Sequence, residues 1–175
     1  GTNEDTPSTP TDVNSILASA GWADVDTGAI KGIAVTADNS NGDWQYSTDG
    51  TNWTSFSGIT SSNALLLSSS TQIRYQPDSL NGETATFDFV AWDTTTGSAS
   101  AFGSPSYADP GSGGGTTAYS SETATASTVV TDVNDAVVAV ADSDTATEAG
   151  GVANATAGSN PSGNVLSNDI EYDTG

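Results

Sequence analysis

The chain has 175 residues and carries 22 acidic side chains against two basic ones, Lys31 and Arg74, for a formal net charge of −20. Nucleic acid and anionic membrane surfaces are excluded as partners because both require clustered basic side chains, and no apolar run is long enough to insert into a bilayer. The chain has no Cys and no His, which excludes disulfides, zinc–thiolate sites, thiol nucleophiles and every reaction that needs an imidazole.

The first predicted element is a short helix near the N-terminus, within residues 11–21, TDVNSILASAG. Thr11 or Asp12 is a suitable N-cap, because its side-chain oxygen can accept a free N–H of the first turn. Gly21 stands where a helix ends in a left-handed residue. The apolar face of this helix is formed by Val13, Ile16 and Leu17.

Beyond the helix, apolar residues alternate with polar ones, which is typical of half-buried strands. Trp44 and Tyr46 share one face of a strand and are assigned to the core. The Asp49-Gly50 pair after them predicts a hairpin with a type I′ turn, because both residues accept the positive φ that this turn needs. Strands are also predicted at residues 65–67 and 73–75, and in the segment TATFDFVAW, whose buried face is formed by Ala85, Phe87, Phe89 and Ala91.

Glycines interrupt the pattern in residues 103–121, which predicts a long flexible loop, and a long strand follows at residues 123–133. Arg74 is expected to pair with Asp88 across strands in a surface ion pair. About seven short strands, one small helix and no alternation of strands with helices predict an all-β fold, an antiparallel β-sandwich.

The composition changes at the acidic joint TDVNDA, so residues 1–133 are predicted to form one β-sandwich domain. Residues 134–175 contain one apolar strand, at 136–141, and too few large apolar residues to bury a core of their own. This tail is therefore either the opening of a second domain or a strand that packs on something else.

An internal echo favours a second domain. The segments ADVDTG (Ala23–Gly28) and IEYDTG (Ile170–Gly175) share an acid-x-Asp-Thr-Gly pattern. Each lies downstream of an acid, Glu4 in the first case and Glu148 in the second. The end of the chain is therefore interpreted as the beginning of a second, similar repeat.

The acids themselves point to a divalent cation. Seventeen are Asp and five are Glu, and Asp in turns supplies the short, hard oxygen ligands that Ca²⁺ prefers. Clustered carboxylates repel one another, and a divalent cation converts that repulsion into attraction. Because alternate loops of a sandwich gather at one end, we expect a site near the N-terminal pole formed by Glu4, Asp24, Asp26 and Asp93.

Four segments carry a family resemblance: GWADVDTGAIKGIAVT, WQYSTDGTNWTSF, IRYQPDSLNGETATFDFVAWDTTTG and VNDA. They resemble a bacterial cadherin-like repeat of large surface adhesins of the RTX type. The tail, AVADSDTATEAGGVANATAGSNPSGNVLSNDIEYDTG, resembles the start of a VCBS-type repeat from the same class of proteins. Together the two resemblances cover nearly the whole chain, although the glycine-rich loop near Gly113 is longer than the pattern expects.

The resemblance implies an immunoglobulin-like or cadherin-like sandwich, stiffened by Ca²⁺ and strung in tandem as an extender on the bacterial cell surface. It implies an extracellular protein, secreted by a type I system, that takes part in cell adhesion and biofilm formation and whose partners are neighbouring repeats. By similarity to such repeats, Asp132, Asn134 and Asp135 would bind Ca²⁺ together with Glu171 and Asp173. Asp78, in the turn PDSLNG, would join them from the first domain.

Two other functions remain as alternatives. In the first, the chain is a subunit of an extracellular filament, and residues 136–142 add as a strand to the sheet edge of a neighbouring copy. In the second, Trp22, Trp44, Trp53 and Trp92 with Tyr46 form a sugar-stacking platform of a carbohydrate-binding module. Paired carboxylates also suit a glycosidase, but these acids lie in turns with metal-like spacing, so the sequence predicts that the protein is not an enzyme.

Overall fold

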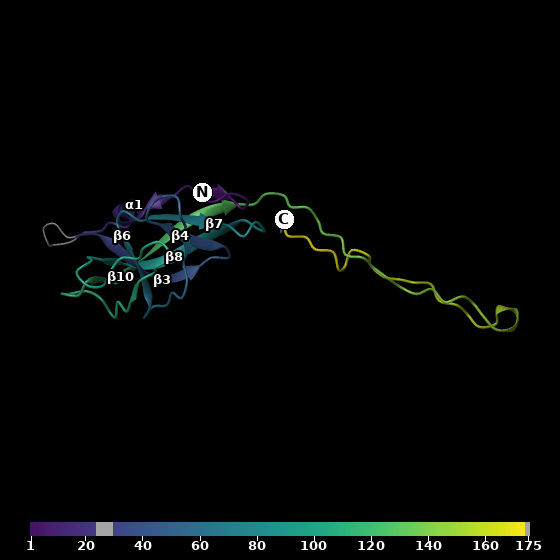
Figure 1. Cartoon of the computed structure of the whole chain (residues 1–175). Coiled ribbons are helices and arrows are strands. Elements are labelled where there is room, and N and C mark those ends of the chain that lie inside the picture. Colours follow the sequence, from purple (N-terminus) through teal and green to yellow (C-terminus); the bar gives the residue numbers. More distant parts are fainter. Residues whose placement is uncertain (24–29, 174–175) are drawn as a thin grey trace. The chain divides into compact units, whose positions relative to one another are not determined.

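The computed structural model describes residues 1–23 and 30–173 (Figure 1). The chain divides into two compact units, Gly1–Val133 and Asn134–Gly175, which are described one at a time. All named strands and the α-helix belong to the first unit, and the described part of the second unit contains a single 3-10 helix, η1 (Val152–Asn154).

The first unit is an all-β sandwich of two sheets with one helix, as the sequence predicts. One sheet has six strands in the order β1-β10-β8-β3-β6-β9, and the other has four in the order β2-β7-β4-β5. Neighbouring strands are antiparallel except β1 and β10, which run parallel. The elements are β1 (Thr2–Asn3), β2 (Thr11–Asp12), α1 (Val13–Ser19), β3 (Gly32–Asn39), β4 (Asp43–Ser47), β5 (Thr54–Ser55), β6 (Ala64–Ser68), β7 (Gln72–Gln76), β8 (Glu83–Trp92), β9 (Tyr107–Ala108) and β10 (Tyr119–Thr131).

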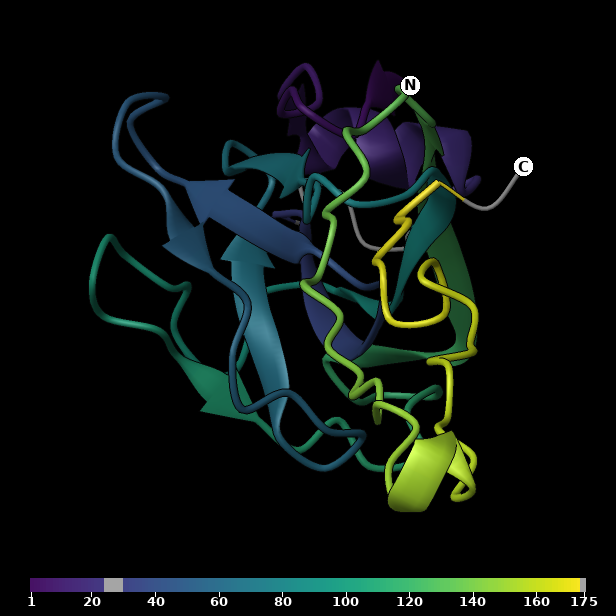
Figure 2. The same ribbon diagram turned by 90° about the vertical axis from the view of Figure 1, so that its right-hand side faces the viewer.

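Helix α1 begins and ends as its sequence predicts and lies alongside the strands in Figure 2. The carboxylate of Asp12 accepts the backbone N–H of Ser15 at 2.8 Å, so Asp12 is the N-cap. Gly21 has a φ of 74°, the left-handed conformation expected after a helix. The buried face of the helix, Val13 and Leu17, packs into the core between the sheets.

The two sheets pack through an aromatic core. The indole of Trp44, on β4, lies 4.8 Å from the ring of Phe87, on β8, and 5.0 Å from the ring of Tyr75, on β7. Such tilted and edge-on contacts are favourable and add to the free energy of burying the rings. Trp44 and Tyr46 are both buried, which confirms their assignment to the core.

The predicted loop is irregular over most of its length, and a few of its residues pack on the outer face of the six-stranded sheet. Val90, Leu66 and Ala118 form a second apolar cluster there with Trp92. The indole N–H of Trp92 donates to the carbonyl of Thr96 at 2.8 Å, and β9, inside the loop, pairs with β6. The loop prediction agrees with the mostly irregular backbone, but Tyr107–Ala108 form β9, and Ala118 and Tyr119 cover the apolar outer ends of β6 and β8.

The predicted type I′ turn is also wrong, although the hairpin exists. Tyr46 lies opposite Thr54, residues 48–53 connect the two strands, and only Gly50 of the predicted pair has a positive φ. The carboxylate of Asp49 accepts the N–H groups of residues 51 and 52 at 2.9 and 2.8 Å. This side chain thus stabilises a longer turn in place of the two-residue one.

The predicted ion pair between Arg74 and Asp88 is not formed. Arg74 lies on β7 in the four-stranded sheet, and Asp88 lies on β8 in the other sheet. The guanidinium Nε donates to Gln45 Oε1 at 2.8 Å, and Asp88 accepts the hydroxyl of Thr125 at 2.6 Å. Alternation along the strands identified the exposed faces but not the sheet to which each strand belongs.

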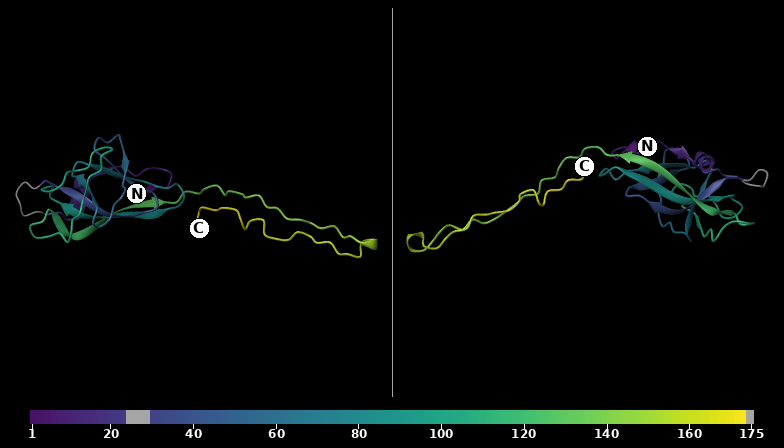
Figure 3. Two further views of the ribbon diagram at one scale, coloured as in Figure 1. Left: turned by 60° about the horizontal axis from the view of Figure 1, so that its bottom comes forward. Right: turned by 180° about the vertical axis from the view of Figure 1, so that it is seen from behind.

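The second unit consists of two extended segments that run side by side in opposite directions and meet near η1 (Figures 1 and 3). Isolated bridges join Val138 to Ile170, Thr147 to Ser159 and Gly150 to Thr156. The predicted strand at residues 136–141 is therefore wrong, because only Val138 makes a bridge there. Its valines are largely exposed, and without a core to enter they do not hold the segment in a sheet.

Neither α1 nor any other helix among the described residues has the length and apolar character needed to cross a membrane.

Candidate functional site

Glu4 is the acid that the fold of the first unit holds most firmly. It follows β1 and is completely buried. Its backbone N–H donates to the carbonyl of Thr131 at 3.1 Å, and its Oε1 accepts the N–H of Val133 at 2.8 Å. Ser79 Oγ also donates to its carbonyl at 3.3 Å. A buried carboxylate is costly unless it is solvated by such groups, so Glu4 fixes the start of the unit against the end of β10.

Asp78 and Asp132 lie at the same end of the sandwich. Asp132, just after β10, accepts the N–H of Gly82 through Oδ1 at 2.8 Å. Asp78 accepts the N–H of Leu80 at 3.3 Å within the turn that joins β7 to β8. Both carboxylates are exposed, and each uses only part of its lone-pair capacity in these bonds. Three segments thus bring acidic oxygens to the end of the sandwich where β10 stops.

Asp93 is not part of this group, and the prediction that it converges with Glu4 is wrong. Asp93 follows Trp92 at the far end of β8, whereas Glu83 at the near end lies opposite Val130. A ten-residue strand spans about 30 Å at roughly 3.4 Å per residue. The Asp93 carboxylate instead accepts the N–H and hydroxyl of Thr95 at 2.8 and 2.6 Å.

Asp24 and Asp26, the other two members of the predicted polar site, lie outside the described residues, as does most of the first echo segment.

The second unit has its own acidic group, which joins its first residues to its last. Asp173 Oδ2 accepts the N–H of Asp135 at 2.7 Å, and Glu171 Oε1 accepts the N–H of Asp173 at 3.3 Å. The amide of Asn134 donates to the carbonyl of Asp135 at 2.8 Å. The second oxygen of Asp173 is shielded from solvent and accepts no hydrogen bond from the described residues. The unit thus brings Asn134, Asp135, Glu171 and Asp173 together.

The two basic side chains of the protein are engaged elsewhere in the first unit. The Lys31 ammonium lies 4.5 Å from the centre of the Trp22 ring, and the Arg74 guanidinium lies 4.2 Å from that of Trp53. These cation–π contacts cover one face of each indole. Trp44 and Trp92 are buried. Because two tryptophans are in the core and two carry a cation, the interpretation as core residues is favoured over a sugar-stacking platform.

A third acidic group surrounds Tyr75 and was missed by sequence reasoning. The Tyr75 hydroxyl donates to Glu83 and accepts the N–H of Gly42 at 2.5 Å. Burial and the bond to Glu83 raise the pKa of Tyr75 above its usual value. Partial desolvation, and then the charge of Asp43, also raise the pKa of Asp38 nearby. Glu83 Oε2 also accepts the N–H of Asn41 at 3.1 Å, so the cluster ties the β3–β4 connection to the start of β8.

Chemically, the two ends of the 132–135 joint offer carboxylates, an amide oxygen and backbone carbonyls, which are the ligands of a hard cation such as Ca²⁺. Comparison with known proteins adds nothing to this: no family model, no curated protein and no solved structure matches the chain.

Proposed function

We propose that this protein is an extender repeat of a secreted bacterial surface adhesin, with an immunoglobulin-like or cadherin-like sandwich, and that Ca²⁺ bound at the 132–135 joint stiffens it. The observation that carries the proposal is the placement of acids on both sides of the joint sequence. Glu4, Asp78 and Asp132 gather where the first unit ends, and Asp135, Glu171 and Asp173 gather where the second begins.

Electrostatics supports a cation at these positions. The chain has a net charge of −20, and both of its basic side chains are stacked on tryptophans. Clustered carboxylates without a cation would repel each other and loosen the joint. Ca²⁺ takes six to eight oxygen ligands from flexible loops, so it binds such a group without requiring a preformed cage.

The proposed mechanism is mechanical. Ca²⁺ bound to ligands from consecutive units restricts bending at the joint, and repeated joints keep a ligand-binding tip away from the cell. Cell adhesion and biofilm formation follow from that extension, with neighbouring repeats as the partners and the bacterial surface as the location.

The proposal is tested by calorimetric titration of Ca²⁺ into the whole chain and by thermal melting with and without chelator. We expect saturable Ca²⁺ binding and a lower melting temperature in chelator. Asp173→Asn should weaken binding strongly, whereas Asp142→Asn, which removes the same charge from an exposed position of the same unit, should have little effect. Equal binding by the two variants, or melting curves that chelator leaves unchanged, would refute the proposal.

The filament alternative is favoured by one observation, the absence of a core in the second unit. Among its described residues no side chain is buried, and the valines of residues 136–142 are exposed. A carbohydrate-binding module has no comparable support, and titration with sugars while following tryptophan fluorescence tests it directly.

A further inference from the structure

The long strand β10 has one edge that is almost uncovered. Among the described residues, each sheet is bordered by two edge strands that have only two residues each: β1 and β9 in one sheet, β2 and β5 in the other. Such short edge strands discourage unwanted pairing with other chains. β1 pairs only with Val130 and Thr131 of β10. Residues 123–129 therefore pair with β8 on one side and with no described strand on the other.

This edge lacks the features that normally prevent strand addition. Residues 123–129, TATASTV, contain no charged residue and no proline, although 14% of the chain is charged. Their register with β8 is unbroken from Thr123 to Val130. A long, regular and uncharged edge is a template for another strand, because its N–H and C=O groups on that side can form backbone hydrogen bonds with an added strand.

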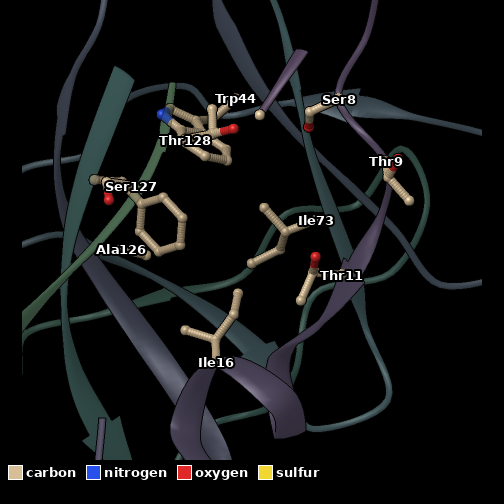
Figure 4. A pocket seen from close by; sticks show the side chains of 11 residues that line it. Ser8, Thr9, Thr11, Ile16, Trp44, Ile73, Ala126, Ser127 and Thr128 are labelled. Carbon is tan, nitrogen blue, oxygen red and sulfur yellow. The ribbon is translucent and has the colours of Figure 1, made fainter. Parts of the chain in front are cut away.

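A groove accompanies the edge. A cavity of about 300 Å³ lies between Ala126–Thr128 of β10 on one side and residues 8–11 on the other. Figure 4 shows Ile16, Trp44 and Ile73 between these two walls. A second cavity of about 390 Å³ adjoins it along residues 124–127. Neither cavity is lined by a charged side chain, and Ser and Thr side chains alternate there with apolar ones, so the groove suits an occupant with small uncharged side chains.

One segment of the same sequence has these properties. Residues 136–141, AVVAVA, are the longest run of the second unit without a polar side chain. Val138 is 45% and Val140 is 40% exposed. Both backbone groups of Val138 face Ile170, and successive residues of an extended chain point to opposite edges. The N–H and C=O groups of Val137 and Ala139 thus point to an edge that no described strand occupies.

Length and orientation also agree. Six residues against seven at about 3.3 Å each give two strands of nearly equal length, roughly 20 Å. β1 runs parallel to β10, so a strand added along residues 123–129 in line with β1 would also run parallel to β10. In the sequence echo, residues 136–141 precede Glu148 as β1 precedes Glu4.

We propose that residues 136–141 of a second copy of this chain add as a strand to the vacant edge of β10, parallel to it, with alternate side chains in the groove. Backbone hydrogen bonds would supply affinity, and the valines would supply register. Two copies of a chain with a net charge of −20 repel each other. This repulsion is weakest for contacts between segments that have no charged side chains. This interface uses no carboxylate, so it is independent of the proposed Ca²⁺ binding.

The absence of cysteine from the chain makes the test clean. A copy carrying Ser127→Cys is mixed with copies carrying a cysteine at 137, 138, 139 or 140 in turn, and oxidised heterodimers are quantified by mass. Paired strands bring Cα atoms within disulfide range, and their side chains alternate between faces. We expect heterodimers several-fold above a Ser62→Cys control at alternate positions only. Equal yields at all four positions, or yields no higher than the control, would overturn the proposal.

A second measurement follows the mass of the full chain by light scattering over a range of concentrations. We expect concentration-dependent association that Val138→Asp and Val140→Asp abolish. Val152→Asp, which changes a 91% exposed valine of the same unit, should leave association intact. If the chain is monomeric at every concentration, the proposal is contradicted. This holds also if residues 136–141 bind to the β10 groove of the same molecule. Both measurements are repeated in chelator, where the result should not change even if Ca²⁺ binding proves absent.

Discussion

The two units of this chain are built from similar residues but are held together in opposite ways. In the first unit, Leu66 is 0% exposed and lies within an apolar cluster, whereas Leu166 in the second unit is 69% exposed. The second unit is joined by isolated bridges and by carboxylates such as Asp169, which accepts the N–H of Val140. The contrast shows that the first unit is stabilised by a buried core, whereas the described residues of the second unit are joined mainly by hydrogen bonds.

The largest expected effect comes from one substitution made in both units. Leu66→Ala should lower the free energy of unfolding by about 2–5 kcal/mol, because it removes buried methyl groups and leaves a cavity. Leu166→Ala should change it by less than about 0.5 kcal/mol, as is usual for exposed positions. Urea denaturation measures both, and similar losses in the two variants would show that the second unit has a core after all.

Calcium should sharpen the contrast. A ligand present at 100 times its dissociation constant stabilises the state that binds it by about 2.7 kcal/mol. We expect Ca²⁺ to slow amide hydrogen exchange in residues 134–173 and at Val133, while the amides of β3 and β8, deep in the sandwich, stay equally protected with or without it. Uniform slowing throughout the first unit would contradict this expectation.

Glu4 tests the end of the first unit. Glu4→Ala removes the acceptor of the Val133 N–H, and leaving a buried donor unsatisfied costs about 1–3 kcal/mol. Glu122→Ala, at an exposed position of β10, is the matched control. Thermal melting of both variants in chelator isolates this structural contribution from any bound ion, and equal melting temperatures would show that the bond contributes nothing.

The cation–π contact of Arg74 should have a smaller effect. Its guanidinium stacks on Trp53 and donates to Gln45. Stacking at such a partly exposed site contributes about 0.5–1 kcal/mol. Arg74→Ala should lower stability by that order and change the fluorescence of Trp53, whereas Arg74→Lys should retain part of the stacking. Unchanged fluorescence in Arg74→Ala would contradict the contact.

The smallest effects concern the pH response of two aspartates in the first unit. Hydrogen bonds from the backbone and side chain of Asn52 lower the pKa of Asp49, so its contribution to stability is present above the usual Asp pKa and is lost as pH falls through the lower folded value. Partial desolvation raises the pKa of Asp38, so stability falls as pH rises through that higher value. Carboxyl NMR titration should therefore find Asp38 protonated first on acidification, and the reverse order would contradict both shifts.

Much of the first unit was predictable because its periodicity reflects burial. The alternation at Trp44 and Tyr46 and the cap at Asp12 correspond to the strand faces and the helix start that the structure contains. Local patterns indicate which face of an element is buried, and a few consecutive residues are enough to establish it.

Features that depend on the arrangement of strands were not predictable. Asp93 and Glu4 are at opposite ends because β8 spans the sandwich between them, and the sequence does not state how many strands separate two loops. Tyr75 meets Glu83 because the turn after β7 crosses from one sheet to the other. Residues 136–141 have strand-like composition, but composition forms no strand where there is no apolar surface to cover.

The parallel pairing of β1 with β10 has a mechanical consequence. Gly1 lies beside Val129, Val133 follows β10, and the two strands point in the same direction. A force that pulls Gly1 and Val133 apart therefore acts along the strands and in opposite senses, which is a shear load. The bond that the Glu4 N–H donates to the Thr131 carbonyl and the bond that the Val133 N–H donates to Glu4 Oε1 then share the tension and rupture together. Bonds loaded from one end would open one after another.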